Sequence, residues 1–179
     1  MKKYLFALLI IGPMMLSSCK KNEKEVEPES TGGSATLTAD RYGVDGGSST
    51  KFSSTKAGIT QTTVAGLSTF TISAIKDGSN ETINIIVLKK VTTVGKITFA
   101  YNDSSNGGIT FSKDYTKPAD GTLNYKTDAF NSTTKGGGEL NITKIDGNSV
   151  EGTFYFIAIN SAGKEAWAEN GSFKGTIKQ

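Results

Sequence analysis

From residue 34 to residue 179, apolar and polar residues alternate in short runs, which glycine, asparagine, aspartate and serine separate. In the first run, Ala35, Leu37 and Ala39 occupy every second position, with threonines between them. Successive side chains of a β-strand point to opposite faces, so this alternation places the three apolar side chains on one face. The pattern therefore predicts a strand, and it recurs along the whole stretch.

Eight further segments have the alternation, or the threonine, isoleucine, valine and aromatic content, that is typical of strands. They are 70–75, 82–88, 96–101, 122–126, 138–145, 151–159, 165–169 and 171–178. Asp146-Gly147 and Ala162-Gly163 predict tight hairpin turns between such segments, because glycine readily adopts positive φ angles. This organisation predicts an all-β fold, either an antiparallel β-sandwich or a partly closed barrel, of about eight to ten strands.

The start of the chain does not fit this pattern and has the three parts of a secretion signal. Lys2 and Lys3 give a positive start, residues 5–16 are mostly apolar, and two serines follow before Cys19. The apolar stretch is shorter than the ~20 residues that a transmembrane helix needs. We therefore expect residues 1–18 to be removed as a signal peptide.

The sequence "LSSC", which ends at Cys19, resembles the bacterial lipobox. The resemblance implies that a signal peptidase cleaves before Cys19, whose sulfur then carries diacylglycerol and whose new amino group carries a fatty acid such as palmitate. Cys19 is the one cysteine of the chain, so it cannot form an internal disulfide. The alternative is a buried free cysteine that packs as a small apolar residue. Two or more acyl chains anchor a protein stably, so lipidation would place the mature chain on a membrane without a span.

The mature chain divides into a tether and one domain. Residues 19–33 are rich in charge and contain a proline and a glycine pair, which predicts a solvated, flexible tether. The fourteen residues after Cys19 reach at most roughly 45 to 50 Å when fully extended. Residues 34–179 have the size of a single β domain. We expect no substantial helix in the mature chain, because no segment repeats apolar residues at helical spacing over three turns.

The stretch 136–175 reads "GGGELNITKIDGNSVEGTFYFIAINSAGKEAWAENGSFKG". It resembles a family of small β-rich lipoproteins from Bacteroidetes-type bacteria, in which a glycine-rich lead enters an "ITK-D" strand. A "GTF-F-A-N" strand then follows, and the chain closes on "NGSF". The resemblance extends upstream through "GTLNY" and "GKITFAY", to about Lys96. It implies an all-β lipoprotein of the bacterial envelope, at the outer membrane, and it implies no catalytic residues; the leaflet stays open.

The residue types present exclude several kinds of chemistry. The chain has no histidine and no thiol beyond Cys19, which excludes the usual serine triads, thiol nucleophiles and zinc sites built on histidine or cysteine. The formal net charge is only +3, and no glycine pair continues into a phosphate-binding motif. We therefore expect no cofactor, no metal and no nucleic-acid partner. The catalytic arrangement that remains is a glycosidase-type carboxylate pair, drawn from Glu139, Glu151, Glu165 and Glu169.

The segment 151–159 is apolar on both faces. Phe154, Phe156 and Ala158 form one face, and Tyr155, Ile157 and Ile159 form the other. The second face needs a cover, which can be a loop of the same chain, a partner chain or a bound apolar ligand.

Trp167 shares a strand face with Glu165 and Glu169, while alanines occupy the opposite face. This places the single tryptophan on the polar side of its strand. A tryptophan exposed beside carboxylates can stack on a sugar ring or anchor a partner protein. The alternative is a half-buried tryptophan at a sheet edge.

These features lead to three hypotheses for function. The first is a lipid-anchored envelope protein with a non-catalytic binding or structural role, whose ligand is a glycan or a protein and whose residues include Trp167, Glu165 and Glu169. The second is a carrier of a small apolar ligand, held in a cavity lined by Tyr155, Ile157 and Ile159. The third is a carboxylate-based glycan hydrolase. We favour the first of the three and therefore expect that the protein is not an enzyme.

Overall fold

The computed structural model describes residues 34–179, which form ten strands and, within this range, no helix. The strands are β1 (Ala35–Val44), β2 (Thr50–Val64), β3 (Leu67–Ile75), β4 (Thr82–Val87), β5 (Gly95–Ala100), β6 (Gly107–Ser112), β7 (Asn124–Lys126), β8 (Gly137–Asp146), β9 (Ser149–Ile159) and β10 (Glu165–Lys178). The all-β prediction is confirmed. The predicted signal peptide (1–18), the predicted tether (19–33) and the predicted lipidation site Cys19 lie outside the described residues. Residues 34–179 include no helix with the length and apolarity of a membrane span.

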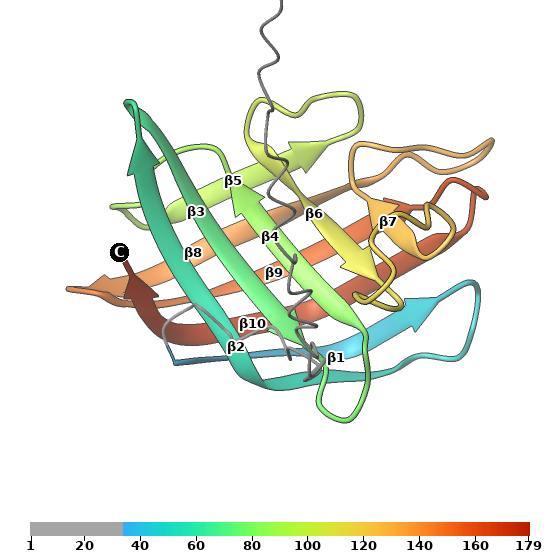
Figure 1. Ribbon diagram of the computed structural model, residues 1–179, viewed down its shortest axis with the longest axis horizontal. Helices are drawn as coiled ribbons and strands as arrows, with labels where there is room; N and C mark the ends of the chain where they lie inside the picture. The colour runs from blue at the N-terminus through green and yellow to red at the C-terminus, as the bar shows by residue number, and fades with distance from the viewer. Residues whose placement is uncertain (1–33) are drawn as a thin grey trace, which may run out of the picture.

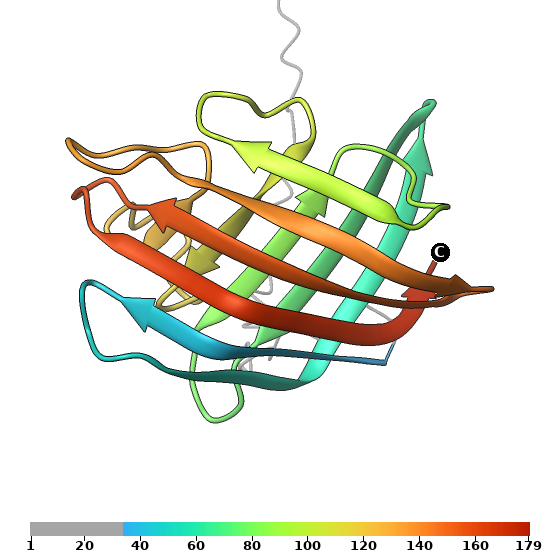
Figure 2. The same ribbon diagram turned by 180° about the vertical axis from the view of Figure 1, so that it is seen from behind.

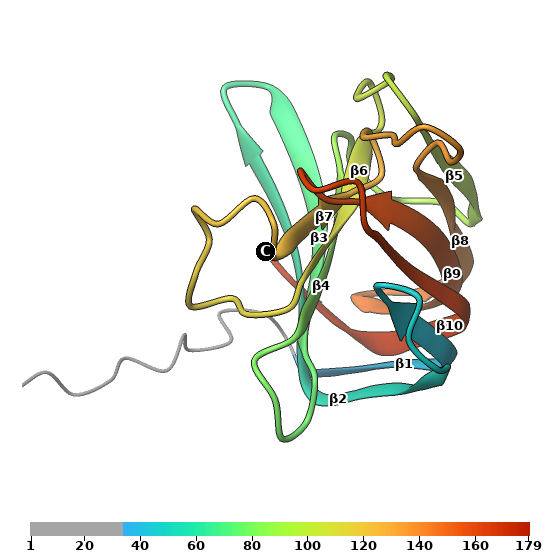
Figure 3. The ribbon, with the colours of Figure 1, turned by 90° about the vertical axis from the view of Figure 1, so that its right-hand side faces the viewer.

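Eight of the strands close a barrel. Figures 1 and 3 show its curved wall from two sides. Around it, each strand bonds to the next in the order β1, β2, β3, β4, β6, β7, β9 and β10, and β10 bonds back to β1. The other two strands extend the wall, because β8 pairs with β9 and β5 pairs with β8 (Figure 2). All these pairings are antiparallel, apart from a short parallel contact of Ile177 in β10 with Ile59 in β2. Of the two predicted architectures, a sandwich and a partly closed barrel, the structure has the barrel, and the barrel is closed.

The barrel interior is built from the period-two pattern. Along β9, Phe154 and Phe156 point inward and are almost fully buried, while Thr153 and Tyr155 point outward. The same alternation in the other strands fills the interior with aromatic and aliphatic side chains. The largest that are fully buried are Tyr125, Phe52, Phe70, Phe99, Phe111, Phe156, Leu37, Ile59, Ile72, Ile83, Ile85 and Ile109. Removing this apolar surface from water, at ~25 cal/mol per Å², is the main stabilising contribution.

Two strands, β2 and β6, were absent from the sequence prediction. The inward positions of β2 include Ser54, Ala57 and Gln61, which are small or polar, so the alternation of hydrophobicity is weak there. The strand β6 begins with the pair Gly107 and Gly108, which reads as part of a loop. In both cases pairing with neighbouring strands, rather than local composition, makes the segment a strand.

The two predicted hairpins are present. Gly147 in the β8–β9 turn has φ 59°, and Gly163 in the β9–β10 turn has φ 72°. A third tight turn joins β2 to β3, where Ala65 and Gly66 have φ 51° and 83°. Two consecutive positive φ angles are typical of a type I′ turn, which matches the twist of the strands it joins.

A polar cluster lies where β1 ends. The Tyr125 hydroxyl donates to Asp45 Oδ1 at 2.6 Å, and Lys113 Nζ donates to Asp45 Oδ2 at 2.9 Å. Burial pushes the pKa of Asp45 upward, but these two bonds outweigh it and hold the pKa below its usual value. The neighbouring Tyr42 is 2% exposed, and within residues 34–179 its hydroxyl has no hydrogen-bond partner. Of these two buried tyrosine hydroxyls, that of Tyr125 has a hydrogen-bond partner and that of Tyr42 has none among residues 34–179.

Candidate functional site

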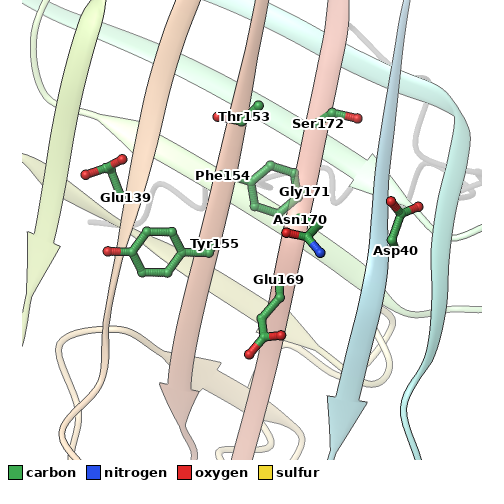
Figure 4. A pocket seen from close by; sticks show the side chains of 9 residues that line it. All are labelled: Asp40, Glu139, Thr153, Phe154, Tyr155, Glu169, Asn170, Gly171 and Ser172. Atoms are coloured by element: carbon green, nitrogen blue, oxygen red, sulfur yellow. The ribbon is translucent and has the colours of Figure 1, made fainter.

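A depression of about 610 Å³ lies on the outer wall of the barrel, over β1, β10, β9 and β8 (Figure 4). Most of its lining is polar, with one outward aromatic ring. The lining residues are Asp40, Glu139, Thr153, Phe154, Tyr155, Glu169, Asn170, Gly171 and Ser172.

A β-bulge in β10 shapes this depression. Ala168 pairs with Phe156 and Gly171 pairs with Phe154, so two residues of β10, Glu169 and Asn170, stand opposite one residue of β9. Asn170 has φ 52°, in the left-handed region that asparagine tolerates better than most residues. The extra residue lets both polar side chains point outward, where a regular strand would turn one of them inward.

The bulge also corrects the sequence prediction of separate strands at 165–169 and 171–178. The structure joins them in one strand, β10, because Asn170 and Gly171 form a bulge and not a turn. The ring of Phe154 packs closely against Gly171, since a Cβ added to this glycine would lie 2.6 Å from the ring. Only glycine therefore fits at position 171 without displacing Phe154.

Ion pairs surround the depression. Arg41 Nη1 lies 2.7 Å from Glu169 Oε2, and Lys96 Nζ lies 3.2 Å from Glu139 Oε1. Because these pairs are partly exposed, they add little stability, on the order of 0 to 1 kcal/mol each. Their effect is to limit the directions in which the two carboxylates can point. The carboxylate oxygens remain available as hydrogen-bond acceptors for a ligand.

Tyr155 supplies the apolar surface of the depression. Its side chain extends from β9 towards β8, in the direction of Glu139 (Figure 4), and the residue is 50% exposed. The ring offers an apolar face, and its hydroxyl can donate and accept hydrogen bonds. Tyr155 and the carboxylates of Glu139 and Glu169 therefore belong to one site.

Trp167 lies on the outer face, as predicted, but it does not line the depression. Its ring covers Gly43 of β1, where an added Cβ would lie 2.7 Å from the indole. The guanidinium of Arg41 lies 5.6 Å from the centre of the indole ring and also pairs with Glu169. Trp167 therefore affects the site indirectly. It packs against Arg41, and Arg41 pairs with Glu169.

Two of the other predicted residues lie elsewhere. Ile159 is 1% exposed, and it pairs with Lys126 where β9 meets β7. Glu165 accepts a hydrogen bond from Asn131 Nδ2 at 3.0 Å. The side chains of Thr134 and Asn131 favour the charged form of Glu165 and lower its pKa. Glu165 therefore stabilises the loop between β7 and β8 and lies outside the depression.

The structure contradicts the internal cavity lined by Tyr155, Ile157 and Ile159. Tyr155 and Ile157 are 50% and 40% exposed on the outer wall, because the inward positions of β9 are taken by phenylalanines and an alanine. Only Ile159 is buried. These three residues therefore cannot line one interior cavity.

Among the four glutamates considered for catalysis, Glu139 and Glu169 line the same depression. Glu151 lies apart from them, paired with Lys174 at 3.1 Å and Lys144 at 3.7 Å. Within residues 34–179, no group of three or more acidic or other metal-binding side chains could hold a metal ion. The lining of the depression offers hydrogen-bonding side chains together with one aromatic ring.

Sequence reasoning missed Asp40, Asn170 and Ser172 as members of this site. All three are polar residues at outward positions, which is the commonest place for such residues and carries no signal of its own. The one local signal was the Asn170-Gly171 pair, a sequence that favours positive φ and so marks a turn or a bulge.

Comparisons of this chain with protein-family models, with curated proteins and with solved structures give no match. The resemblance to β-rich envelope lipoproteins therefore stays a prediction.

Proposed function

We propose that this chain is a lipid-anchored protein of the bacterial envelope whose β-barrel binds glycans, without catalysis, in the depression on its outer wall. The observation that carries the proposal is the exposed ring of Tyr155 among polar side chains on β1, β10, β9 and β8. The membrane anchor is Cys19, on the lipobox resemblance.

Sugar rings have apolar C–H faces and hydroxyl groups at their edges. An aromatic ring can pack against such a face, and carboxylates, amides and hydroxyls can bond the edge. The depression offers both kinds of contact, from Tyr155 and from Glu139, Glu169 and Asn170. An apolar ligand would shield these polar groups from water and would satisfy none of their remaining hydrogen-bonding positions, at a cost in free energy. The composition of the site therefore favours a glycan over a lipid-like ligand.

The pairing of the carboxylates supports a binding role. Glu139 and Glu169 each lie beside a cation, Lys96 and Arg41. Each paired carboxylate still has lone pairs that can accept hydrogen bonds from ligand hydroxyls.

The test is affinity electrophoresis of the chain through gels that contain single bacterial and plant polysaccharides. We expect at least one polysaccharide to retard the unaltered protein. Tyr155→Ala should weaken the retardation by about tenfold, equivalent to ~1.4 kcal/mol, because it removes the stacking ring.

Tyr155→Phe keeps the ring and should keep most of the retardation. Ile157→Ala is the matched control, since Ile157 is an exposed apolar residue of the same strand outside the depression. Equal retardation of the Tyr155→Ala and Ile157→Ala proteins would rule out the depression as the binding site. The anchor is tested separately by intact mass, since Cys19→Ala should abolish incorporation of palmitate.

A further inference from the structure

Four of the exposed large apolar residues belong to two segments of the barrel. Val64 and Leu67 flank the β2–β3 turn and are 73% and 78% exposed. Leu88 and Val94 lie in the segment between β4 and β5 and are 51% and 60% exposed. We name these four residues the apolar rim.

Both segments of the apolar rim lie at one end of the barrel. The last pair between β3 and β4 joins Phe70 to Val87. Because these strands are antiparallel, Leu88 comes next after this pair at the end where β3 begins, which is the end of the β2–β3 turn. The segment 88–94 is tied to β2, because the amide of Val91 donates to Gln61 Oε1 at 2.7 Å. Figures 1 and 2 show the β2–β3 turn and the connection from β4 to β5 at the same end.

Two lysines lie beside the apolar rim in the sequence. Lys89 and Lys90 follow Leu88 directly, and both are exposed. Between residues 46 and 102 the acidic residues are Asp77 and Glu81, and both belong to the connection between β3 and β4, at the opposite end of those strands. Exposed apolar side chains with lysines beside them, and no acids nearby along these strands, are typical of surfaces that bind anionic lipid headgroups.

The described chain also begins at this end. Ala35 pairs with Gly175 near the end of β10 and with Ala57 of β2, and Figures 1 and 2 show the start of β1 on the side of the β2–β3 turn. Along β2, Ala57 and Val64 are seven residues apart, or about 23 Å at the rise of a strand. The fourteen residues from Lys20 to Gly33 reach at most roughly 45 to 50 Å. A lipid on Cys19 can therefore lie in the plane of the apolar rim.

We propose that the apolar rim docks onto the lipid surface that holds Cys19, with Val64, Leu67, Leu88 and Val94 in the interface and Lys89 and Lys90 at the headgroups. This inference rests on the proposed lipid anchor. Docking at this end leaves the outer wall with Tyr155 free for a glycan. The anchor and the apolar rim together then set the orientation of the barrel on the membrane.

The test uses the lipidated full chain in vesicles of phosphatidylethanolamine and phosphatidylglycerol. Cys19 is the one cysteine and its sulfur is alkylated in this form, so an introduced cysteine is the only free thiol. A nitroxide spin label is attached at Leu67→Cys. Its accessibility to oxygen, which partitions into lipid, is compared with its accessibility to a water-soluble nickel complex. We expect oxygen access at position 67 to exceed nickel access several-fold, as it does in lipid.

Phe130→Cys is the matched control. Phe130 is 60% exposed in the loop between β7 and β8, which Figure 1 shows at the opposite end of the barrel. A nitroxide there should remain accessible to nickel. Val64→Ser together with Leu88→Ser should return the nitroxide at position 67 to the behaviour of the control. Because these side chains are exposed, the substitutions leave the core intact.

The outcomes separate the two proposals. A nitroxide at position 67 that is as accessible to nickel as the control, in a chain whose mass includes the lipid, overturns the docking and leaves the anchor standing. A chain without lipid mass, which also takes up nitroxide on Cys19, overturns the anchor and the docking with it. Equal immersion in vesicles of phosphatidylcholine alone would overturn the role of Lys89 and Lys90.

Discussion

Tyr42 and Tyr125 show how differently two buried phenols contribute to one core. Both are nearly or fully buried, and burial raises the pKa of each well above the usual value for tyrosine. Tyr125 donates to Asp45, whereas the hydroxyl of Tyr42 lies near Glu81 but outside hydrogen-bonding geometry. A buried hydroxyl without a partner loses its bonds to water and gains none, so it costs stability.

We expect Tyr42→Phe and Tyr125→Phe to have different effects on the free energy of unfolding. Tyr42→Phe should leave it unchanged or raise it by up to about 1 kcal/mol, because it removes an unsatisfied hydroxyl. Tyr125→Phe should lower it by about 1 to 3 kcal/mol, because it removes one of the two side-chain hydrogen bonds that Asp45 accepts and leaves that carboxylate oxygen unsatisfied. Urea denaturation of both variants measures the difference. A large loss with Tyr42→Phe would mean that its hydroxyl bonds Glu81 in solution.

The pairing of Gly43 with Trp167 makes the tryptophan a reporter of the outer wall. The ring lies where a side chain on Gly43 would be, and Trp167 is the only tryptophan of the chain. Gly43→Ala should push the ring away from the wall and shift its fluorescence emission to longer wavelength, at a cost of about 1 to 3 kcal/mol in stability. Ser172→Ala, on the same strand, is the control and should leave the emission unchanged. An unshifted spectrum for Gly43→Ala would contradict this packing.

At the scale of elements, the β10 bulge connects the fold to the candidate site. The strand continues through Asn170, although its positive φ departs from the extended conformation. The register of β10 with β9 and with β1 on either side holds this conformation in place. The bulge therefore depends on tertiary pairing, and the outward direction of Glu169 depends on the bulge.

The bulge leads to a matched pair of substitutions at Asn170. Asn170→Gly should be tolerated, because glycine adopts the left-handed region without strain. Asn170→Val should destabilise the protein by about 1 to 2 kcal/mol, because a β-branched side chain is strained there. Thermal unfolding measures both variants. Similar melting temperatures would show that the bulge relaxes to a regular strand when residue 170 changes.

At the scale of the whole molecule, the barrel has a weakly paired junction between β7 and β9, which we call the seam. The strand β7 has three residues, and it pairs with β9 through Lys126 and Ile159 alone. By contrast, β9 pairs with β10 along most of its length. A closed barrel has no free edges, so the seam is the place where closure depends on the fewest hydrogen bonds.

We expect native-state hydrogen exchange to show this seam opening first. The amides of β7 should exchange orders of magnitude faster than those of Phe156 and Ala168, which lie in the long β9–β10 ladder. Measurement by NMR in increasing denaturant separates local from global opening. Equal protection of both sets of amides would show that the barrel opens only as a unit.

The sequence by itself determined the class of the fold and many of its strands. Alternation along segments such as 70–75 and 151–159 decides which side chains are buried, because the two-residue period of a strand is local. The hairpins at Gly147 and Gly163 were predictable for the same reason, since positive φ is a property of a few residue types. The pattern also placed Trp167 on the outer wall.

Only the tertiary structure decided barrel closure, the paths of β2 and β6, and the candidate site. Closure depends on pairs such as Lys126 with Ile159 and Ala35 with Gly175, which lie far apart along the chain and leave no local pattern. The depression likewise brings together Asp40, Glu139, Tyr155 and Asn170 from four strands. Each is an ordinary outward residue of its own strand, and they become one surface because sheet register, a non-local property, sets them side by side.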